Sequence, residues 1–320
     1  MHLPPGWSEG TTDEETDDTE VILTPDDSMY LPASHKTRAA ATTCNLLADP
    51  SSPVSESDGL CTRHEIEQLT HNLAKYLEDG RELVHRANAL QGTVASSLPA
   101  EVLFELRRWI RAPESRMAWI AGGPVLEYGT GLSAAALRLC SISKDAGLPC
   151  VSFVCKMSYR FASTTQLSTR EAGLVAMLYS IIVQLAYLLP TEFPASDELE
   201  ECKGKFRSLD GTMDSVEAAL DIVRALLVHA PPSLIWVLDG FQLVEGPTTR
   251  GYLAALVDIL RDQEQQGGLL SKVCFTTDGN SSVLMRALSA SETIDASRME
   301  DRIPGRPMRA AADMSELGWW

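Results

Sequence analysis

The sequence predicts a three-layer α/β fold, with helices on both faces of a parallel sheet of about five strands. Short apolar segments of strand length alternate with longer segments whose apolar residues recur at helical spacing. Strands that are apolar along their whole length are typical of parallel sheets buried on both faces. The composition fits a sizeable core, because 44% of the 320 residues are apolar and 22% are charged.

The first 60 residues are predicted to form a disordered acidic tail. They hold twelve Asp and Glu against Lys36 and Arg38, and they are rich in Thr, Ser and Pro. Such a segment buries too little apolar area to offset the entropy that it loses on ordering. An acidic arm that binds a partner is the alternative.

Three short helices are expected before the sheet. Apolar residues at helical spacing predict the first over residues 62–77, and Gly80 separates it from a second over 81–90. Pro99 suits the first turn of a third helix, which continues through Ile110. We expect these helices to dock on the domain that follows, with docking on a partner as the alternative.

Strands and helices then alternate along the chain. The strands are expected at residues 117–121, 150–155, 233–239, 272–276 and 292–296. The helices are expected at residues 133–146, 171–189, 215–229, 251–263 and 281–288. The main domain is therefore predicted over residues 98–296, after a helical segment at 61–97 and before an irregular tail at 297–320.

One uncharged segment, residues 173–190, resembles a membrane span. It is only about 17 residues long before Pro190, which is the lower limit for crossing a bilayer. It also contains Ser180 and Gln184, and a helix buried in a layered α/β core gives the same pattern. We therefore expect no membrane insertion. A cytoplasmic location is expected, because the N-terminus shows no apolar signal segment.

Charge and cysteine usage argue against two further classes of protein. The net charge is −17 and no basic stripe occurs, so nucleic-acid binding is not expected. No C-x-x-C pair or histidine cluster is present, so no metal site of that kind is expected. An odd number of cysteines favours a reducing compartment. The seven cysteines stand at positions 44, 61, 140, 150, 155, 202 and 274.

A glycine-rich turn follows the first predicted strand. The segment GGPVLEYGTGLSAAALRL, residues 122–139, has the order of a phosphate-binding loop: apolar strand, glycine turn, Ser and helix. Backbone amides at the start of such a helix favour an anion. The candidate nucleotide-binding residues in this turn are Gly129, Thr130, Gly131 and Ser133.

Asp239 is the second part of the candidate site. It ends the apolar strand LIWVLD, and in phosphate-loop ATPases an Asp at this place holds magnesium directly or through water. Ser133 and Asp239 are therefore the candidate ligands of a Mg²⁺ ion that would accompany ATP or ADP.

Taken together, these segments resemble the NACHT and related STAND ATPase core of fungal signalling proteins, a P-loop NTPase fold. The resemblance covers about residues 100–296 and rests on five segments in order: WIRAPESRMAWIAGG, GTGLSAAALRL, GLVAMLYSIIVQLAYLLP, LIWVLDGFQLVE and KVCFTTDG. It implies a nucleotide-controlled signalling platform that assembles with protein partners. It also implies a strand order, from edge to edge, of 292–296, 117–121, 272–276, 233–239 and 150–155.

The chain departs from this family where the family places charge. Leu132 stands in place of the loop lysine, and the longer loop brings in Glu127. Gln242 replaces the family's second acid, and Asp278 replaces its arginine. Phosphoryl transfer depends on charge placed against the phosphate oxygens, so we expect a pseudo-ATPase that acts as an interaction or signalling scaffold. A switch with weak residual ATP or GTP binding is the alternative.

Two other interpretations of the glycine turn compete with this one. Residues 129–134 fit a G-x-G-x-x-A dinucleotide fingerprint, but Lys156 stands where its acid is expected. Residues 131–135 resemble the nucleophile elbow of hydrolases, which needs a histidine after Asp239, and none follows. His229, which precedes Asp239, is expected to cap its helix instead. A binding protein that uses the core as a rigid platform needs neither chemistry, and Asp239 would then cap a turn.

Overall fold

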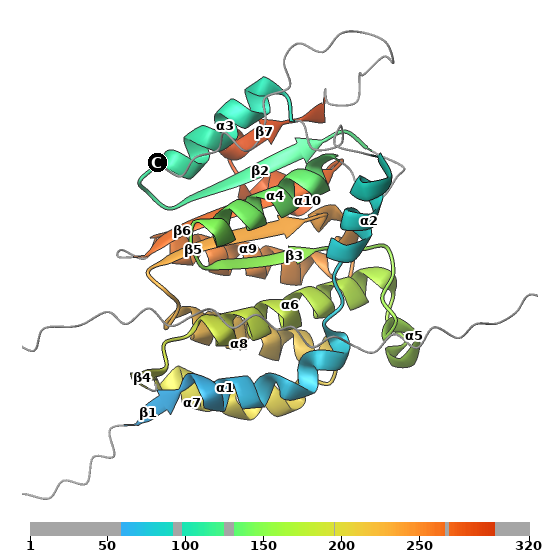
Figure 1. The fold of residues 1–320 in the computed structure, drawn as a ribbon. Coiled ribbons are helices and arrows are strands. Elements are labelled where there is room, and N and C mark those ends of the chain that lie inside the picture. Colours follow the sequence, from blue (N-terminus) through green and yellow to red (C-terminus); the bar gives the residue numbers. More distant parts are fainter. Residues whose placement is uncertain (1–58, 92–97, 125–130, 195, 266–268, 298–320) are drawn as a thin grey trace, which may run out of the picture. The chain divides into compact units, whose positions relative to one another are not determined.

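The computed structural model describes residues 59–297 apart from 92–97, 125–130, 195 and 266–268 (Figure 1). The predicted acidic tail, except for its last two residues, lies outside the described residues, as does nearly all of the predicted C-terminal tail. The description below therefore concerns the part of the chain that carries the sheet.

Five parallel strands form the central sheet, in the order β3-β5-β6-β2-β7. This is the order that the family resemblance implied, with the fourth strand of the series placed between the first and the third. The α/β fold class with a five-stranded parallel sheet is thus confirmed. The strands are β2 (Arg116–Gly122), β3 (Cys150–Val154), β5 (Ser233–Asp239), β6 (Leu270–Asp278) and β7 (Thr293–Asp295).

Side chains that alternate along each strand divide the core into two apolar layers. In β2, Met117 and Trp119 join one layer, whereas Ala118 and Ile120 join the other. Helices α3 and α4 cover the second layer, and in Figure 1 α4 crosses in front of the strands while α9 lies behind them. The helices of the two layers are α3 (Ala100–Arg111), α4 (Gly131–Asp145), α6 (Thr169–Leu188), α8 (Val216–Leu227), α9 (Arg250–Gln265) and α10 (Ser282–Ala287).

Helix α6 is a core helix. Ser168 caps its first turn and Glu171 returns the hydrogen bond, which fixes where the helix begins. By length and composition α6 is able to cross a membrane, but 67% of its apolar window is buried inside the protein. Helices α1 (Arg63–Thr70) and α8 pack against it, as does the 3₁₀ helix His71–Tyr76. The interpretation of this segment as a buried helix therefore agrees with the structure.

A buried lysine fastens α3 to the sheet. Lys272 lies near the amino end of β6 and is only 1% exposed. Its Nζ donates to the backbone carbonyls of Trp109, Ala112 and Glu114 at 2.9, 2.7 and 2.7 Å. Burial lowers the pKa of Lys272 to about 8, so at neutral pH the ammonium still offers one N–H to each carbonyl. The expected docking of α3 on the following domain is thus confirmed.

Several short elements were not predicted. The segment from 190 to 214 carried no expected element, yet it contains β4 (Glu192–Pro194), which pairs antiparallel with β1 (Leu60–Thr62). Helix α7 (Asp197–Lys205) follows, and only Leu199 and Cys202 are buried in it. Two buried residues give too weak a periodic pattern to be recognised in a polar segment. Helices α2 (Arg81–Gln91) and α5 (Ala162–Thr165) complete the α-helices of the described residues.

Candidate functional site

The carboxyl ends of β2, β5 and β6 meet the start of α4 at one edge of the sheet. Doubly wound sheets bind ligands at this edge. In the strand register Gly122 is opposite Asp278, and Asp239 is opposite Thr276. The alternation of side chains places all four on the face of the sheet that carries α4. Gly122, Asp278, Asp239 and Thr276 thus lie at one edge of the sheet, beside the start of α4.

The structure joins the two predicted metal ligands. Gly131 begins α4 and Ser133 lies in its first turn. The Ser133 hydroxyl donates a hydrogen bond to the Asp239 carboxylate. Gly129 and Thr130 lie outside the described residues. Among the described residues no three His, Cys, Asp or Glu side chains come together as a metal site would require.

Asp239 is enclosed. It is only 3% exposed, and the Thr276 hydroxyl donates to its Oδ1 in addition to the bond from Ser133. Burial raises the pKa of Asp239, and the two hydroxyl donors oppose that rise. The backbone N–H of Cys155 donates to the Asp239 carbonyl at 2.9 Å, which ties β3 to the same point. The carboxylate is thus held by protein hydroxyls and has little contact with solvent.

Leu132 is part of the apolar core. It is 3% exposed and belongs to the layer beneath α3 and α4. A Cβ added at Gly122 would lie 2.6 Å from Leu132 Cδ1, so the leucine packs directly on the backbone of Gly122. At the position where the resembling loop carries its phosphate-binding lysine, this chain therefore has a side chain used for packing.

The turn after β6 is fastened onto the end of β2. Gly279, with φ of +106°, donates its N–H to the Gly122 carbonyl at 3.1 Å. Thr277 Oγ1 donates to the Gly279 carbonyl at 2.8 Å and accepts from Trp119 Nε1 at 2.8 Å. A Cβ at Gly122 would lie 3.4 Å from Asp278 Oδ1. A second carboxylate thus lies beside the start of the glycine loop.

The segment after β5 offers no general base. Gln242 lies in the 3₁₀ helix Phe241–Val244, and its buried Oε1 has no hydrogen-bond partner. The next acid, Glu245, has a side chain that is 9% exposed and accepts from Ser281 Oγ at 2.7 Å. The backbone N–H of Ser282 also donates to it, at 3.2 Å. The carboxylate of Glu245 therefore accepts hydrogen bonds from the start of α10 and holds that helix in place.

The two competing chemistries find no support in this geometry. Lys156 Nζ lies 2.7 Å from the buried carboxylate of Glu78, so no free acid stands at the end of β3 for a ribose. His229 precedes the amino end of β5, whereas Asp239 ends the same strand, which separates them by a full strand length. The His229 ring lies against Phe193, with centroids 4.7 Å apart, and its Nε2 has no hydrogen-bond partner. It stacks on an aromatic ring where a helix cap was expected.

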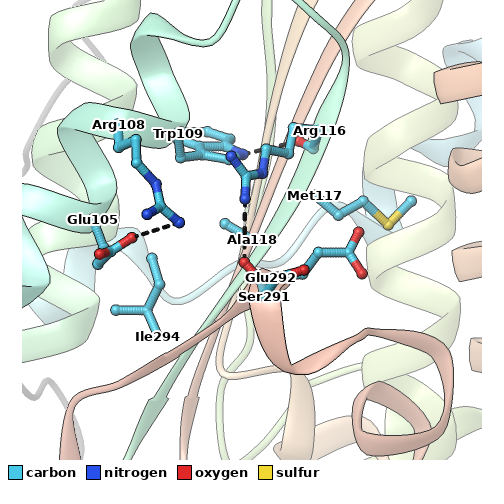
Figure 2. A pocket seen from close by; sticks show the side chains of 9 residues that line it. All are labelled: Glu105, Arg108, Trp109, Arg116, Met117, Ala118, Ser291, Glu292 and Ile294. Carbon is cyan, nitrogen blue, oxygen red and sulfur yellow. Dashed lines mark hydrogen bonds and ion pairs between the residues drawn. The ribbon is translucent and has the colours of Figure 1, made fainter.

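Two hollows lie away from the candidate site. The first, of about 10 Å³, lies between α3 and the β2–β7 edge, where Glu105 pairs with Arg108 at 3.1 Å (Figure 2). Figure 2 also shows Arg116, which donates to the Ser291 carbonyl at 3.3 Å. A cavity of this volume holds no more than one water.

The second cavity is a groove of about 340 Å³ between α7 and α8. On its walls Lys205 pairs with Asp221 at 2.9 Å and with Glu201 at 3.1 Å.

Sequence reasoning missed Thr276 as a member of the candidate site. It lies inside the apolar strand β6 and is fully buried, so its only sequence signal is a hydroxyl residue near the end of a strand. No family model matches the chain, and no curated protein matches it either.

Proposed function

We propose that this chain contains a degenerate P-loop NTPase-like domain of the NACHT/STAND type that acts as a cytoplasmic protein-interaction or signalling scaffold without hydrolysing nucleotide. The strand order β3-β5-β6-β2-β7, which the resemblance implied before the sheet was known, supports the kinship. The contact between Ser133 and Asp239 supports it too, because these residues match the metal-binding pair of the family.

The proposed loss of catalysis rests on one observation: Leu132 is buried against Gly122, and Asp239 is enclosed by Ser133 and Thr276. With Leu132 in place of the lysine, the cation that would bind the phosphates is missing. The hydrogen bonds from Ser133 and Thr276 occupy the carboxylate that would bind magnesium. Losing one charge-stabilising group typically lowers a rate by roughly 10² to 10³. With Asp278 added beside the loop, the described charges near the start of α4 repel phosphate.

A switch with weak residual nucleotide binding is the second candidate. The observation in its favour is the preserved Ser133–Asp239 pair at the start of α4. A Mg²⁺ ion would have to replace the hydrogen bond between them, and the amides at the helix start would still attract an anion. ATP, ADP and GTP are therefore the ligands to test.

Calorimetric titration distinguishes the two candidates. Wild-type protein is titrated with ATP, ADP and GTP, with and without magnesium, beside Asp239→Ala and the exposed-site control Asp258→Ala. The scaffold proposal expects no binding in the micromolar range for any of the three proteins. Micromolar, magnesium-dependent binding by the wild type and by Asp258→Ala, lost in Asp239→Ala, would establish the switch instead.

Repair of the loop provides the converse test. Leu132→Lys alone should not restore ATP hydrolysis, because the longer loop misplaces the new ammonium and Gln242 still lacks a carboxylate. Leu132→Lys combined with removal of three or four loop residues should raise ATP affinity, since charge and geometry are then both restored. Hydrolysis by either variant at a rate above buffer would contradict the assignment of the missing groups.

Light scattering tests the scaffold part of the proposal. A nucleotide-controlled platform changes its assembly state when magnesium and ATP are added, because ligand binding shifts the population of states. A scaffold without nucleotide control keeps the same mass in both conditions. A change in mass on addition of ATP and magnesium would overturn the loss of nucleotide control.

A further inference from the structure

Two cysteines meet where α4 lies on β3. Cys140 lies in the second half of α4, and Cys150 is the first residue of β3, which α4 contacts. The chain between them reverses through Gly147, whose φ of +69° suits glycine. Both side chains pack against the apolar layer beneath α3 and α4, and each thiol influences the pKa of the other.

The pair differs from the other described cysteines in its exposure. Cys140 and Cys150 are partly exposed. The remaining free cysteines of the described residues are buried: Cys61, Cys155, Cys202 and Cys274.

A positive charge lies beside the two sulfurs. Arg81, at the start of α2, donates through Nη2 to the Ser152 carbonyl at 2.7 Å and to Ser152 Oγ at 2.9 Å. The hydrogen bond from the Cys150 thiol lowers the pKa of Cys140, with Ser152 and Arg81 adding to the effect while burial and Asp239 oppose it. The same thiol contact raises the pKa of Cys150. The Arg81 guanidinium favours the thiolate of Cys140, and the thiolate is the reactive form.

We propose that Cys140 and Cys150 form a peroxide-sensitive dithiol that closes to a disulfide between α4 and β3. The Cys140 thiolate attacks hydrogen peroxide, takes one oxygen as a sulfenic acid and releases hydroxide. The Cys150 sulfur then attacks the Cys140 sulfur, and the sulfenic hydroxyl leaves as water with the Cys150 proton. One peroxide thus accepts two electrons, and two thiols together with the peroxide become one disulfide and two waters.

Cys274 is the competing partner, and the geometry disfavours it. It lies on β6 near Cys140, but it is fully buried and burial raises its pKa. A buried neutral thiol attacks a sulfenic acid slowly. Cys150 packs on the same apolar layer as Cys140, where α4 contacts β3, so it is the expected partner for an S–S bond of about 2 Å.

The disulfide fixes the second half of α4 to the sheet. Helix α4 is the element whose first turn carries Leu132 and Ser133, so oxidation would stiffen the support of the candidate site. Reversible oxidation of this kind suits a reducing compartment, where protein disulfides are usually transient.

Peptide mapping after native oxidation tests the pairing. The full chain is treated with graded hydrogen peroxide, the remaining thiols are alkylated, and digested peptides are analysed by mass spectrometry. We expect a linked pair of peptides containing Cys140 and Cys150, a loss of two hydrogen atoms in the mass of the intact chain, and full reversal by a reducing dithiol. A Cys140–Cys274 link, or modification without any link, would overturn the pairing.

Single serine variants assign the two roles. In Cys150→Ser the sulfenic acid on Cys140 has no resolving thiol, so a carbon nucleophile should trap it there. In Cys140→Ser the trapped product should be absent, and Cys202→Ser should form the disulfide as the wild type does. Circular dichroism of each variant verifies that it is folded. Equal trapping at position 150 in Cys140→Ser would contradict Cys140 as the attacking sulfur.

Discussion

The two ends of β6 hold charge in opposite ways. Near the amino end, the buried ammonium of Lys272 is satisfied by three carbonyls at and just beyond the end of α3. Near the carboxyl end, Thr276 and Ser133 satisfy the buried carboxylate of Asp239. A phosphate-binding site needs cationic charge at the carboxyl end, beside the start of α4. In this chain the buried cation of the strand holds a helix in place at the other end.

The difference shows which charges serve the fold. Both groups are buried and both form hydrogen bonds within the protein, so each contributes a structural contact. Removing a partner from such a group is costly, whereas a group poised for ligand binding is usually tolerant of replacement. The following substitutions test this distinction at each end of the strand.

Lys272→Met should have the largest effect. It leaves the carbonyls of Trp109, Ala112 and Glu114 buried without their donor, and it should lower the free energy of unfolding by about 3 kcal/mol or more. Urea denaturation measures the change. Lys144→Met, at an exposed position in the last turn of α4, is the matched control and should change stability by less than about 0.5 kcal/mol. Equal losses of stability in the two variants would show that the hydrogen bonds of Lys272 do not stabilise the docking of α3.

Leu132→Lys should have the next largest effect. An ammonium placed in the apolar layer against Gly122 should lower the free energy of unfolding by about 3 kcal/mol, because its charge would be desolvated without a partner. Leu132→Met keeps the volume and should cost less than about 1.5 kcal/mol. If the lysine variant is as stable as the methionine variant, the side chain at 132 can leave the core and reach the loop.

Gly122→Ala tests the contact between β2 and α4. The new Cβ would lie 2.6 Å from Leu132 Cδ1, so we expect a loss of about 2 kcal/mol by overpacking. In a Leu132→Val background, which lacks that atom, the loss should shrink by about 1 kcal/mol. Gly251→Ala has open space around its Cβ and should not destabilise. If the losses of stability add in the double variant, the side chains at positions 122 and 132 are not in steric contact.

Asp239→Asn should have the smallest effect, and its sign depends on pH. Burial raises the pKa of Asp239 above its ordinary value of 3.8. Below pH 3.8 the protonated carboxyl therefore stabilises the folded protein fully, and this stabilisation is lost as the pH rises through the raised pKa of the folded state. Asparagine resembles the protonated form. We therefore expect the variant to exceed the wild type in stability by about 1 kcal/mol at pH 7, with the gain vanishing toward pH 4.

The comparison with Asp258→Asn isolates this effect. Asp258 is exposed on α9, so its replacement should give a stability difference that does not change between pH 4 and pH 7. Differences between each variant and the wild type cancel the titration of all other groups. If the stability gain of Asp239→Asn grew toward acid pH, the pKa of Asp239 would be lowered in the folded protein. That result would contradict the burial of its carboxylate.

The sheet was predictable because its signals are long and repeated. Each strand of the series was expected near its observed position, since fully apolar runs between amphipathic helices leave few alternatives. The short strands β1 and β4 were not predicted, because three residues are too few to show a recognisable alternation of apolar and polar side chains. Helix α7 was missed for a related reason, since only Leu199 and Cys202 mark its buried face.

The candidate site was predictable in part. Ser133 and Asp239 were paired on the strength of their places after strands, and the structure brings them together. The contact of Leu132 with Gly122 was not foreseen, because the sequence shows that a lysine is absent but not where its replacement points. The contact of Thr276 with Asp239 and the proximity of Cys140 to Cys150 depend on how separate elements pack, which spacing along the chain does not encode.

The burial of α6 has a consequence for how the chain is made. The apolar part of α6 leaves the ribosome before α8, which packs against it in the folded protein. Until α8 arrives, this helix of membrane-spanning length has only the elements that precede it as cover, among them β3, α1 and the 3₁₀ helix that follows α1. Nascent chains stalled between α6 and α8 should therefore be the form that chaperones and membranes capture.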